Sequence, residues 1–301
     1  MARIVIAGSL NMDLVAGALR IPAPGETILG THFFTGCGGK GGNQAYAVAK
    51  LGAQAAMLGC VGDDDFGRTL RANLIAVNCN VEGVAEVAGP SGVALIVVAA
   101  TGENSIVVAP GANLKFNLDA ARLDGARLLL LQLEVPLLVV EKAAREARRR
   151  GVQVVLDPAP GQALPDELLR NVDILTPNET EAAILAGIEP GKLTLASAES
   201  IAGQLRARGA AIVIVKLGVQ GCLLVEECGA THFPAPAVKA VDTTAAGDVF
   251  NAALAVGLSE GLSLPEACEL AVAAASLSVT RSGAQASVPS REEVAVFRNA
   301  L

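Results

Sequence analysis

The sequence predicts an α/β protein with a doubly wound, mostly parallel sheet flanked by helices, and with a small antiparallel β lid inserted in it. Short apolar runs alternate with helical patterns along most of the chain. Apolar residues make up 52% of the 301 residues and aromatic residues only 3%, which favours Val/Ile strands and Ala/Leu helices. Two extended stretches have no helix of their own. We treat residues 1–301 as a single domain.

The parallel sheet is predicted from short apolar runs, each bounded by helical patterns. These runs are residues 3–8, 53–61, 127–133, 152–157, 172–177 and 211–218. Strands that alternate with helices imply right-handed crossovers and a sheet covered on both faces. From residue 245 on, the chain is predicted to be mainly helical.

The lid is predicted from the two stretches that break this alternation, residues 11–36 and 90–110. The second resembles a hairpin that turns at "TGEN". Because neither stretch is followed by a helix of its own, we expect both to lie outside the parallel sheet. Lids commonly exclude water from an active site, so we expect this sheet to cover one.

Composition and charge exclude several classes of partner and location. The formal net charge of -7 argues against nucleic-acid binding, which needs a basic surface. The N-terminal apolar run is too short for a signal peptide, and no run reaches the length of a membrane helix. The six cysteines form no CxxC pair, which favours reduced thiols. We expect a soluble, cytoplasmic protein.

The glycine cluster "GCGGKGGNQA" matches two nucleotide-binding patterns poorly. A phosphate-binding P-loop fails because the lysine is followed by glycine instead of serine or threonine. Gly36, Gly38 and Gly41 fit the dinucleotide pattern G-x-G-x-x-G, with Asp63 as the acidic residue further along. The cluster follows a segment that we place outside the parallel sheet, however, and Asp63 also fits the N-cap of the next helix.

Two interpretations of the cluster remain. It is either a tight turn before a helix or a ligand site, in which Asn11, Asp13, Lys40 and Asn43 supply donors and acceptors around a glycine backbone that a ligand can approach closely. Polarity without excess charge suits an uncharged, hydroxyl-rich ligand such as a sugar.

A second candidate site lies in "VDTTAAGDVFNAAL". The backbone N–H groups of Ala246, Gly247 and Asp248 would point from a helix N-terminus, where an anion such as a phosphoryl group is favoured. Asp248 would then accept the proton of a substrate hydroxyl, for which a weak base suffices when the transition state is loose. The alternative is that Asp248 is only a favourably placed charge in the first helical turn.

The segment "TPNETEA" has two interpretations as well. Asn178 and Glu181 fit a capping box at the start of a helix. The same two side chains could hold Mg²⁺, directly or through its waters.

Taken together, the motifs resemble those of the ribokinase-like sugar kinases, the PfkB carbohydrate kinase family. The resemblance covers nearly the whole chain, from "GSLNMD" through "GGKGGNQA", "QLEVPL", "DPAP", "TPNETEA" and "VDTTAAGD" to "GAQASVPSREE". The two signature regions of the family match residues 38–45 and 242–254.

The resemblance implies ATP-dependent phosphorylation of a sugar, with Asp248 as the base. The Asn11 and Asp13 pair together with Lys40 resembles the family members that phosphorylate the 5-hydroxyl of D-ribose to give ribose 5-phosphate. The alternatives are a kinase for deoxyribose, fructose or a nucleoside, a sugar-binding protein without turnover, and a nicotinamide dehydrogenase.

Residue roles follow from the same motif matches. The implied sugar contacts are Asn11, Asp13, Gly39, Lys40, Asn43, Glu134 and Asp248. The implied nucleotide contacts are Asn178, Lys216, Gly218, Gly221 and Gly247, with ATP lying over residues 216–221. Asn178 and Glu181 would belong to the Mg²⁺ and phosphate network. Two positions depart from the family, Lys216 in place of a threonine and Val272 in place of a His or Asn that meets the adenine.

The resemblance also implies a K⁺ site and a dimer. The matching positions for K⁺ are Asp242, Thr244, Ser278, Arg281, Gly283 and Ser287. Backbone carbonyls would supply most of the ligands, and Arg281 its carbonyl only, since its guanidinium would repel the ion. The lid would form the contact of a homodimer.

Overall fold

The structure is a computed structural model that describes residues 3–300. Its main sheet has nine strands in the order β13-β12-β11-β10-β9-β8-β1-β4-β5. Their bounds are β1 (Arg3–Ala7), β4 (Gln54–Gly62), β5 (Asn80–Val87), β8 (Ala126–Leu131), β9 (Gln153–Leu156), β10 (Ile174–Leu175), β11 (Ile212–Lys216), β12 (Cys222–Glu226) and β13 (Gly229–Phe233). Pairing is parallel from β5 to β11 and antiparallel between β11, β12 and β13.

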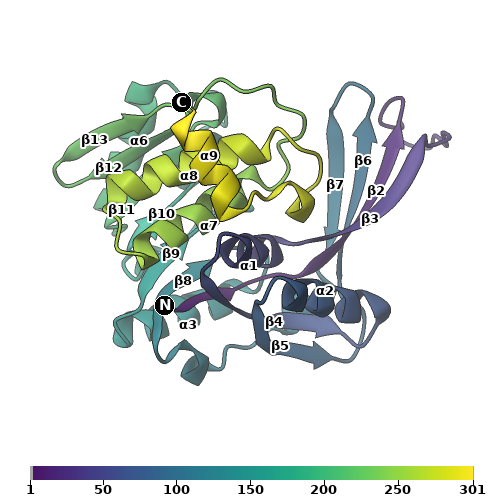
Figure 1. Cartoon of the computed structure of the whole chain (residues 1–301), viewed down its shortest axis with the longest axis horizontal. Coiled ribbons are helices and arrows are strands. Elements are labelled where there is room, and N and C mark those ends of the chain that lie inside the picture. The colour runs from purple at the N-terminus through teal and green to yellow at the C-terminus, as the bar shows by residue number, and fades with distance from the viewer. Residues whose placement is uncertain (1–2, 301) are drawn as a thin grey trace.

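Helices cover both faces of this sheet (Figure 1). Their bounds are α1 (Lys40–Lys50), α2 (Asp65–Ala76), α3 (Leu137–Arg149), α4 (Asp166–Leu169), α5 (Glu179–Ala186), α6 (Leu195–Ala207), α7 (Ala246–Ser259), α8 (Leu264–Ser278) and α9 (Arg291–Asn299), with short 3₁₀ helices η1 (Gly111–Lys115), η2 (Ala120–Leu123), η3 (Gly218–Gln220) and η4 (Gln285–Ser287). Alternate residues of β1 face opposite layers, as the pleat requires. Ile4 and Ile6 pack with α1, α2, α7, α8 and α9, whereas Val5 and Ala7 pack with α3 to α6.

A separate four-stranded sheet projects from one side of the main body (Figure 1). Its order is β3 (His32–Gly38), β2 (Asn11–Ala18), β6 (Gly92–Ala99) and β7 (Asn104–Ala109). The outer pairs are antiparallel, whereas the central β2 and β6 are parallel, a pairing that the prediction of an antiparallel lid did not include.

The predicted fold class is confirmed, and each of the six predicted core strands is present. Three strands of the main sheet were not predicted. β5 is half exposed, and β12 and β13 form an antiparallel hairpin at the sheet edge instead of a βα unit. None of the helices within residues 3–300 has the length and apolar composition needed to span a membrane.

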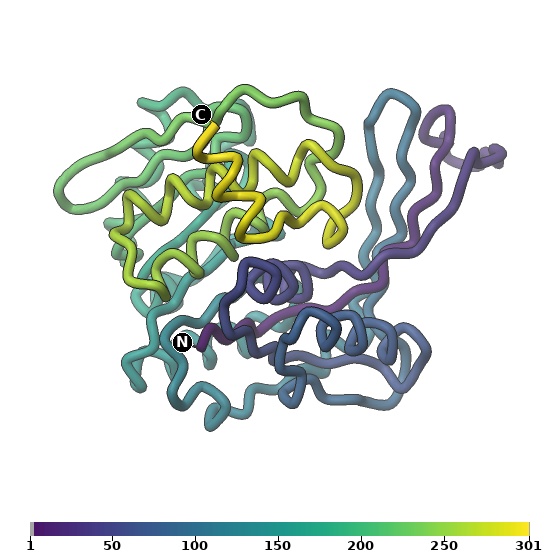
Figure 2. Tube along the Cα trace, in the orientation of Figure 1, coloured from purple at the N-terminus to yellow at the C-terminus, as the bar shows by residue number. Residues whose placement is uncertain are grey.

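The chain passes between the two sheets at a few points only (Figure 2). β1 is followed almost directly by β2, and β3 runs into α1 with Gly39 between them. The carboxyl ends of parallel strands are where ligands bind in sheets of this kind. The start of α1 and the start of β2 therefore lie where the main sheet offers a ligand site.

Candidate active site

The glycine cluster lies at the start of α1 because the backbone there passes very close to the segment between β1 and β2. Gly39, the N-cap, has φ 81, and a Cβ added to it would lie 2.6 Å from the backbone nitrogen of Asn11. A Cβ at Gly41 would lie 2.7 Å from the nitrogen of Ser9. The cluster is therefore the predicted tight turn, and the same approach brings Lys40 and Asn43 to the segment that holds Asn11.

The dinucleotide interpretation does not fit this geometry. Gly36 and Gly38 lie in β3 of the four-stranded sheet, and not in a βα turn of the main sheet. The prediction that Asp63 is the next N-cap was wrong by one residue. Asp64 caps α2 by accepting from the Gly67 nitrogen at 2.8 Å, whereas Asp63 accepts from the Gly89 nitrogen.

Asp248 is a buried carboxylate held from two sides by α1. It stands in the first turn of α7 and is 5% exposed. Its oxygens accept from Nδ2 of Asn43 at 2.9 Å and from Nε2 of Gln44 at 3.1 Å. Burial raises the pKa of Asp248 to about 6, although the Lys40 ammonium opposes the shift. A carboxylate that is fixed, dry and ionised at neutral pH can orient a hydroxyl and take its proton.

A second buried carboxylate, Asp157, lies beside Asp248. It is 2% exposed and follows β9, and its Oδ2 accepts from the same Gln44 amide at 3.3 Å. Gln132 donates to the Gln44 oxygen at 2.6 Å, which fixes the direction of that amide. One glutamine amide therefore separates two carboxylates that would otherwise repel each other.

Glu134 links the start of α1 to the segment after β1 by hydrogen bonds. Its Oε2 accepts from Ser9 Oγ at 2.5 Å and from the Lys40 nitrogen at 3.0 Å, and Asn11 Nδ2 lies 3.5 Å away. Asn11 is 2% exposed, and its oxygen accepts from Asn113 at 2.7 Å. These polar groups are held in place by the protein itself, so a hydroxylated ligand would meet a set of donors and acceptors that is already oriented.

Asp13 lies next to this group on β2. Burial, reinforced by the charges of Glu134 and Asp248, raises the pKa of Asp13 to about 7. The Lys40 ammonium faces the same carboxylates. Burial lowers the pKa of Lys40, but the charges of Asp248 and Asp157 outweigh this and raise it. The sequence-predicted sugar residues are therefore brought together around one charged cluster.

The N-terminus of α7 differs in one respect from the prediction. The chain enters the helix through Ala245 in the left-handed region, at φ 59. This turn directs the Ala246 amide to the Thr243 carbonyl at 3.3 Å. Within residues 3–300 no acceptor faces the amides of Gly247 and Asp248. Two amides, and not the three predicted, are thus open to an anion.

The ends of β10 and β11 lie side by side near this helix. Asn178 forms a bridge with Lys216 and begins α5 with the predicted capping box, in which Glu181 bonds the nitrogen and Nδ2 of Asn178 at 2.8 and 2.9 Å. Both Glu181 oxygens are therefore used locally. Gly218 and Gly221 have φ 55 and 89 and shape the exposed loop that follows Lys216.

The two loops predicted to hold K⁺ are in contact. Asp242 bonds Thr244 through Oδ1 and accepts from the Gly283 nitrogen at 2.8 Å through Oδ2. The Arg281 guanidinium turns away to Glu293, with a shortest distance of 2.7 Å. The hydroxyls of Ser278 and Ser287 each donate to a carbonyl of the preceding turn.

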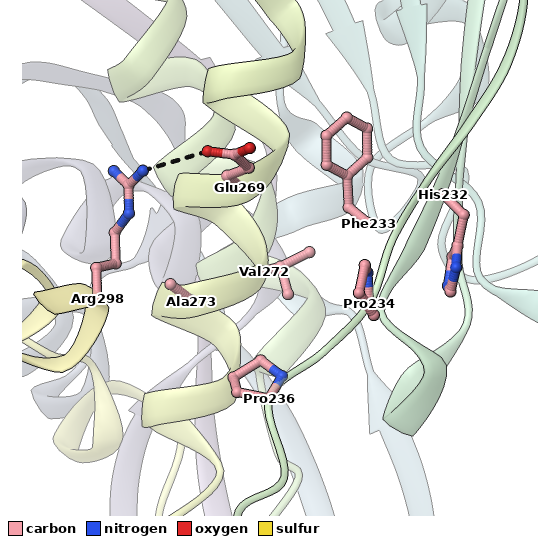
Figure 3. A pocket seen from close by; sticks show the side chains of 8 residues that line it. All are labelled: His232, Phe233, Pro234, Pro236, Glu269, Val272, Ala273 and Arg298. Atoms are coloured by element: carbon pink, nitrogen blue, oxygen red, sulfur yellow. Dashed lines mark hydrogen bonds and ion pairs between the residues drawn. The ribbon is translucent and has the colours of Figure 1, made fainter. Parts of the chain in front are cut away.

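A hollow of about 470 Å³ lies beside the loop that follows β11, between β13 and α8 (Figure 3). Val272 is on its wall together with Phe233 and two prolines, and Glu269 and Arg298 pair at its rim at 3.4 Å. His232 links the hollow to the loop, since its Nε2 lies 2.7 Å from the Gln220 carbonyl. Phe233, Val272 and the prolines give the hollow an apolar part on which a flat heterocycle can pack.

The comparison with known families decides what kind of site this is. The pattern of the pfkB family carbohydrate kinases matches residues 1–291. The chain belongs to this family.

The relatives of this pfkB family kinase include two kinds of sugar kinase. It is 41% identical to the ribokinase of Haemophilus influenzae over 98% of this chain and 97% of the relative. It is 38% identical to the deoxyribokinase of Salmonella typhi over 96% of each. The structure of Arabidopsis thaliana ribokinase complexed with ribose and ATP is 35% identical and matches with a TM-score of 0.92 over 99% of both chains.

Sequence reasoning missed several polar residues of this kinase. They are Ser9, Gln44, Asn113, Asp157 and Gln285. Gln285 donates to the Asn43 oxygen at 3.2 Å and so connects η4 with the amide that holds Asp248. A carboxylate at the end of an apolar run was the available signal for Asp157, since such residues are buried only when they are paired.

Proposed function

We propose that this pfkB family kinase transfers the γ-phosphoryl group of ATP to the 5-hydroxyl of D-ribose, giving ribose 5-phosphate and ADP. The observation that carries the proposal is the position of Asp248. This carboxylate is ionised at neutral pH, bonded to Asn43 and Gln44, and next to the open amide of Gly247. The ribokinase relatives, and the one complexed with ribose and ATP, support ribose and ATP as the substrates.

For the acceptor, we propose that Asn11, Asp13, Lys40, Asn43 and Glu134 bind the sugar hydroxyls, and that the Gly39 turn lets the sugar approach the backbone. Asn11 and Glu134 are held by Asn113 and Ser9. Asp248 would hydrogen-bond the hydroxyl that attacks and then take its proton.

For the donor, we propose that ATP lies over the loop after β11, in contact with Asn178, Lys216, Gly218 and Gly221. The triphosphate would end at the open amides of Gly247 and Asp248, where a helix N-terminus favours an anion. The hollow beside Val272 is the candidate for the base.

We propose Mg²⁺ as the partner of the triphosphate. The residues fit a hydrated ion better than a directly bound one, because the structure within residues 3–300 holds no group of three or more metal-binding side chains. Asn178 and Glu181 bond each other, so they would contact Mg²⁺ through its waters. Bound there, the ion would neutralise phosphate charge.

We propose K⁺ at the contact between the loop before α7 and the loop before η4. Asp242 already joins these loops through Gly283, and the Arg281 guanidinium pairs with Glu293, so Arg281 would contribute its carbonyl only. The remaining ligands would be carbonyls around Thr244, Ser278 and Ser287. K⁺ there would fix the direction of the α7 amides.

We also propose that the four-stranded sheet is a lid and the contact of a homodimer in the cytoplasm. Large apolar side chains are exposed on it, among them Phe33, Ile106 and Val107, each more than half exposed. Uncovered apolar surface of this kind favours association with a second copy. All six cysteines are free, as is usual in the cytoplasm.

The assay that tests the function measures ATP consumption with a panel of sugars. Ribose should give the highest kcat/KM, and deoxyribose, fructose and nucleosides follow as the alternatives, with deoxyribose favoured by the Salmonella typhi relative. Sugar binding without ATP consumption would identify a binding protein instead. Titration with NADH tests the remaining alternative, a dehydrogenase, which would have to bind this cofactor.

A further inference from the structure

Lys216 ends β11 with a buried ammonium group. Its Nζ lies 2.9 Å from Oδ1 of Asp157, and the two side chains are 12% and 3% exposed. Taking an ammonium and a carboxylate out of water is costly, and an apolar pair of similar size often stabilises a fold as well or better. Stability alone therefore gives little reason for a lysine at this position.

The ammonium also reaches the first turn of α7. A Cβ built on Gly247 would lie 3.3 Å from Nζ of Lys216. The amide of Gly247 is one of the two open amides. An ammonium thus stands beside a residue whose amide is open, and the buried Asp248 is the next residue along the helix.

Around Lys216 and the start of α7, negative side chains outnumber positive ones. The charges of four carboxylates, Glu134, Asp157, Glu181 and Asp248, act on the Lys40 ammonium, and two of them, Asp157 and Glu181, also act on Lys216. A phosphoryl group adds further negative charge. Lys216 is the one of the two that stands on the nucleotide side, since it begins the loop containing Gly218 and Gly221.

We propose that Lys216 is a catalytic residue whose ammonium contacts the phosphoryl group during its transfer, an inference that rests on the proposed kinase function. The bond between the γ-phosphorus of ATP and the β,γ-bridging oxygen breaks, and a bond from that phosphorus to the sugar oxygen forms. The hydroxyl proton goes to Asp248, and ADP leaves. The Lys216 ammonium stabilises the charge on the phosphoryl oxygens, while Asp157 holds it in position beforehand.

The first test compares turnover of the wild type with that of Lys216→Met and Lys216→Arg. Loss of one preorganised donor typically costs about 10²–10³-fold in kcat, so we expect a loss of this size for Lys216→Met with the KM for ribose unchanged. Lys216→Arg, which keeps the charge, should recover part of it. Lys192→Met is the matched control, because Lys192 is exposed and outside the site; it should behave as wild type.

A double variant separates this role from simple neutralisation of Asp157. If Lys216 only balances that charge, Asp157→Asn combined with Lys216→Met removes both charges and restores turnover. On our proposal the double variant stays as slow as Lys216→Met. Restored turnover would overturn the proposal.

A binding measurement extends the test to variants that turn over too slowly to assay. ADP with aluminium fluoride imitates the phosphoryl group in transfer. With ribose present, we expect Lys216→Met to bind this complex about tenfold or more weakly, while the affinity for ribose alone stays the same. Equal loss of both affinities would indicate misfolding of the site and overturn the proposal. An inactive wild type would overturn the kinase function itself, whereas an active wild type with an equally active Lys216→Met overturns the Lys216 role alone.

Discussion

The two ends of the site are built differently. At the proposed acceptor end, side chains that are mostly buried bond one another: Asn11 with Asn113, Glu134 with Ser9, and Asn43 with Asp248. At the donor end, the loop after β11 and the segment before α7 are largely exposed, and Val219 is 93% exposed. The protein thus orients the acceptor groups before any ligand arrives, whereas fewer contacts within the protein hold the side chains of the proposed donor end.

The largest expected effect comes from replacing Asp248, the proposed general base at the acceptor end. Asp248→Asn keeps the shape of the side chain but cannot take a proton, so kcat should fall by ~10²–10⁴-fold. Steady-state kinetics with ribose and ATP measure this, and calorimetry should find both ligands still bound. Turnover close to that of the wild type would remove Asp248 from the role of base.

The pH dependence of turnover is a second test of the role of Asp248. The base must be ionised, and burial raises the pKa of Asp248 to about 6. At saturating ribose, where protonation of Asp13 does not limit binding, the wild-type kcat should therefore fall about tenfold per pH unit below about 6, and Asp248→Asn should lack this limb.

Asp13→Asn should weaken sugar binding while making the fold more stable. Hydrogen bonds to charged groups contribute about 1.5–3 kcal/mol, so the KM for ribose should rise by about tenfold or more at pH 8, with the KM for ATP unchanged. If the KM for ATP rose instead, the two ends of the site would be interchanged.

The stability gain follows from the sign of the Asp13 shift. Burial raises its pKa from 3.8 to about 7 in the folded chain. Between these values the folded state binds the extra proton, so the wild-type free energy of unfolding falls as pH rises through that window. Asp13→Asn should therefore have the higher Tm at pH 8 without ligand, and the gain should shrink at pH 5. A gain that is independent of pH would contradict this account.

A smaller effect is expected at the donor end from K⁺. An ion between the two loops would order the α7 amides without touching the sugar, and coupling between sites is typically about fivefold or more. Rates in matched potassium and sodium buffers, at equal ionic strength and saturating magnesium, measure it. Identical kcat values would remove K⁺ from the proposal.

The smallest effect concerns the motion of the lid. Ribose should slow hydrogen exchange in residues 11–36 and 90–110 more than in the parallel strands, because segments that close over a ligand open less often once it is bound. Equal protection in both sheets would argue against a moving lid.

How much the sequence could predict differs between fold and site. Apolar runs predicted six core strands because a strand buried on both faces must be continuously apolar. β13 was not predicted because four of its five residues are exposed. β12 is a buried apolar run, but it is short and is followed by a hairpin turn instead of a helix. The motifs predicted Asp248 and Asn11, but not that Gln44 joins Asp248 to Asp157. That contact depends on how α1 packs across the sheet, which local sequence does not determine.

Asn113 connects two of the places where the chain crosses between the sheets, the one after β1 and the one after β7. It lies in η1, just after β7, and bonds both the nitrogen and the carbonyl of Leu10, at 2.9 and 3.2 Å, as well as Asn11. If the smaller sheet moves as the proposed lid, its pivot and a proposed sugar contact, Asn11, are thus a single unit. A substitution at this pivot would change affinity and opening rate together, whereas substitutions at the far tips of the sheet could alter how fast the sugar enters and leaves while its preference among sugars stays the same.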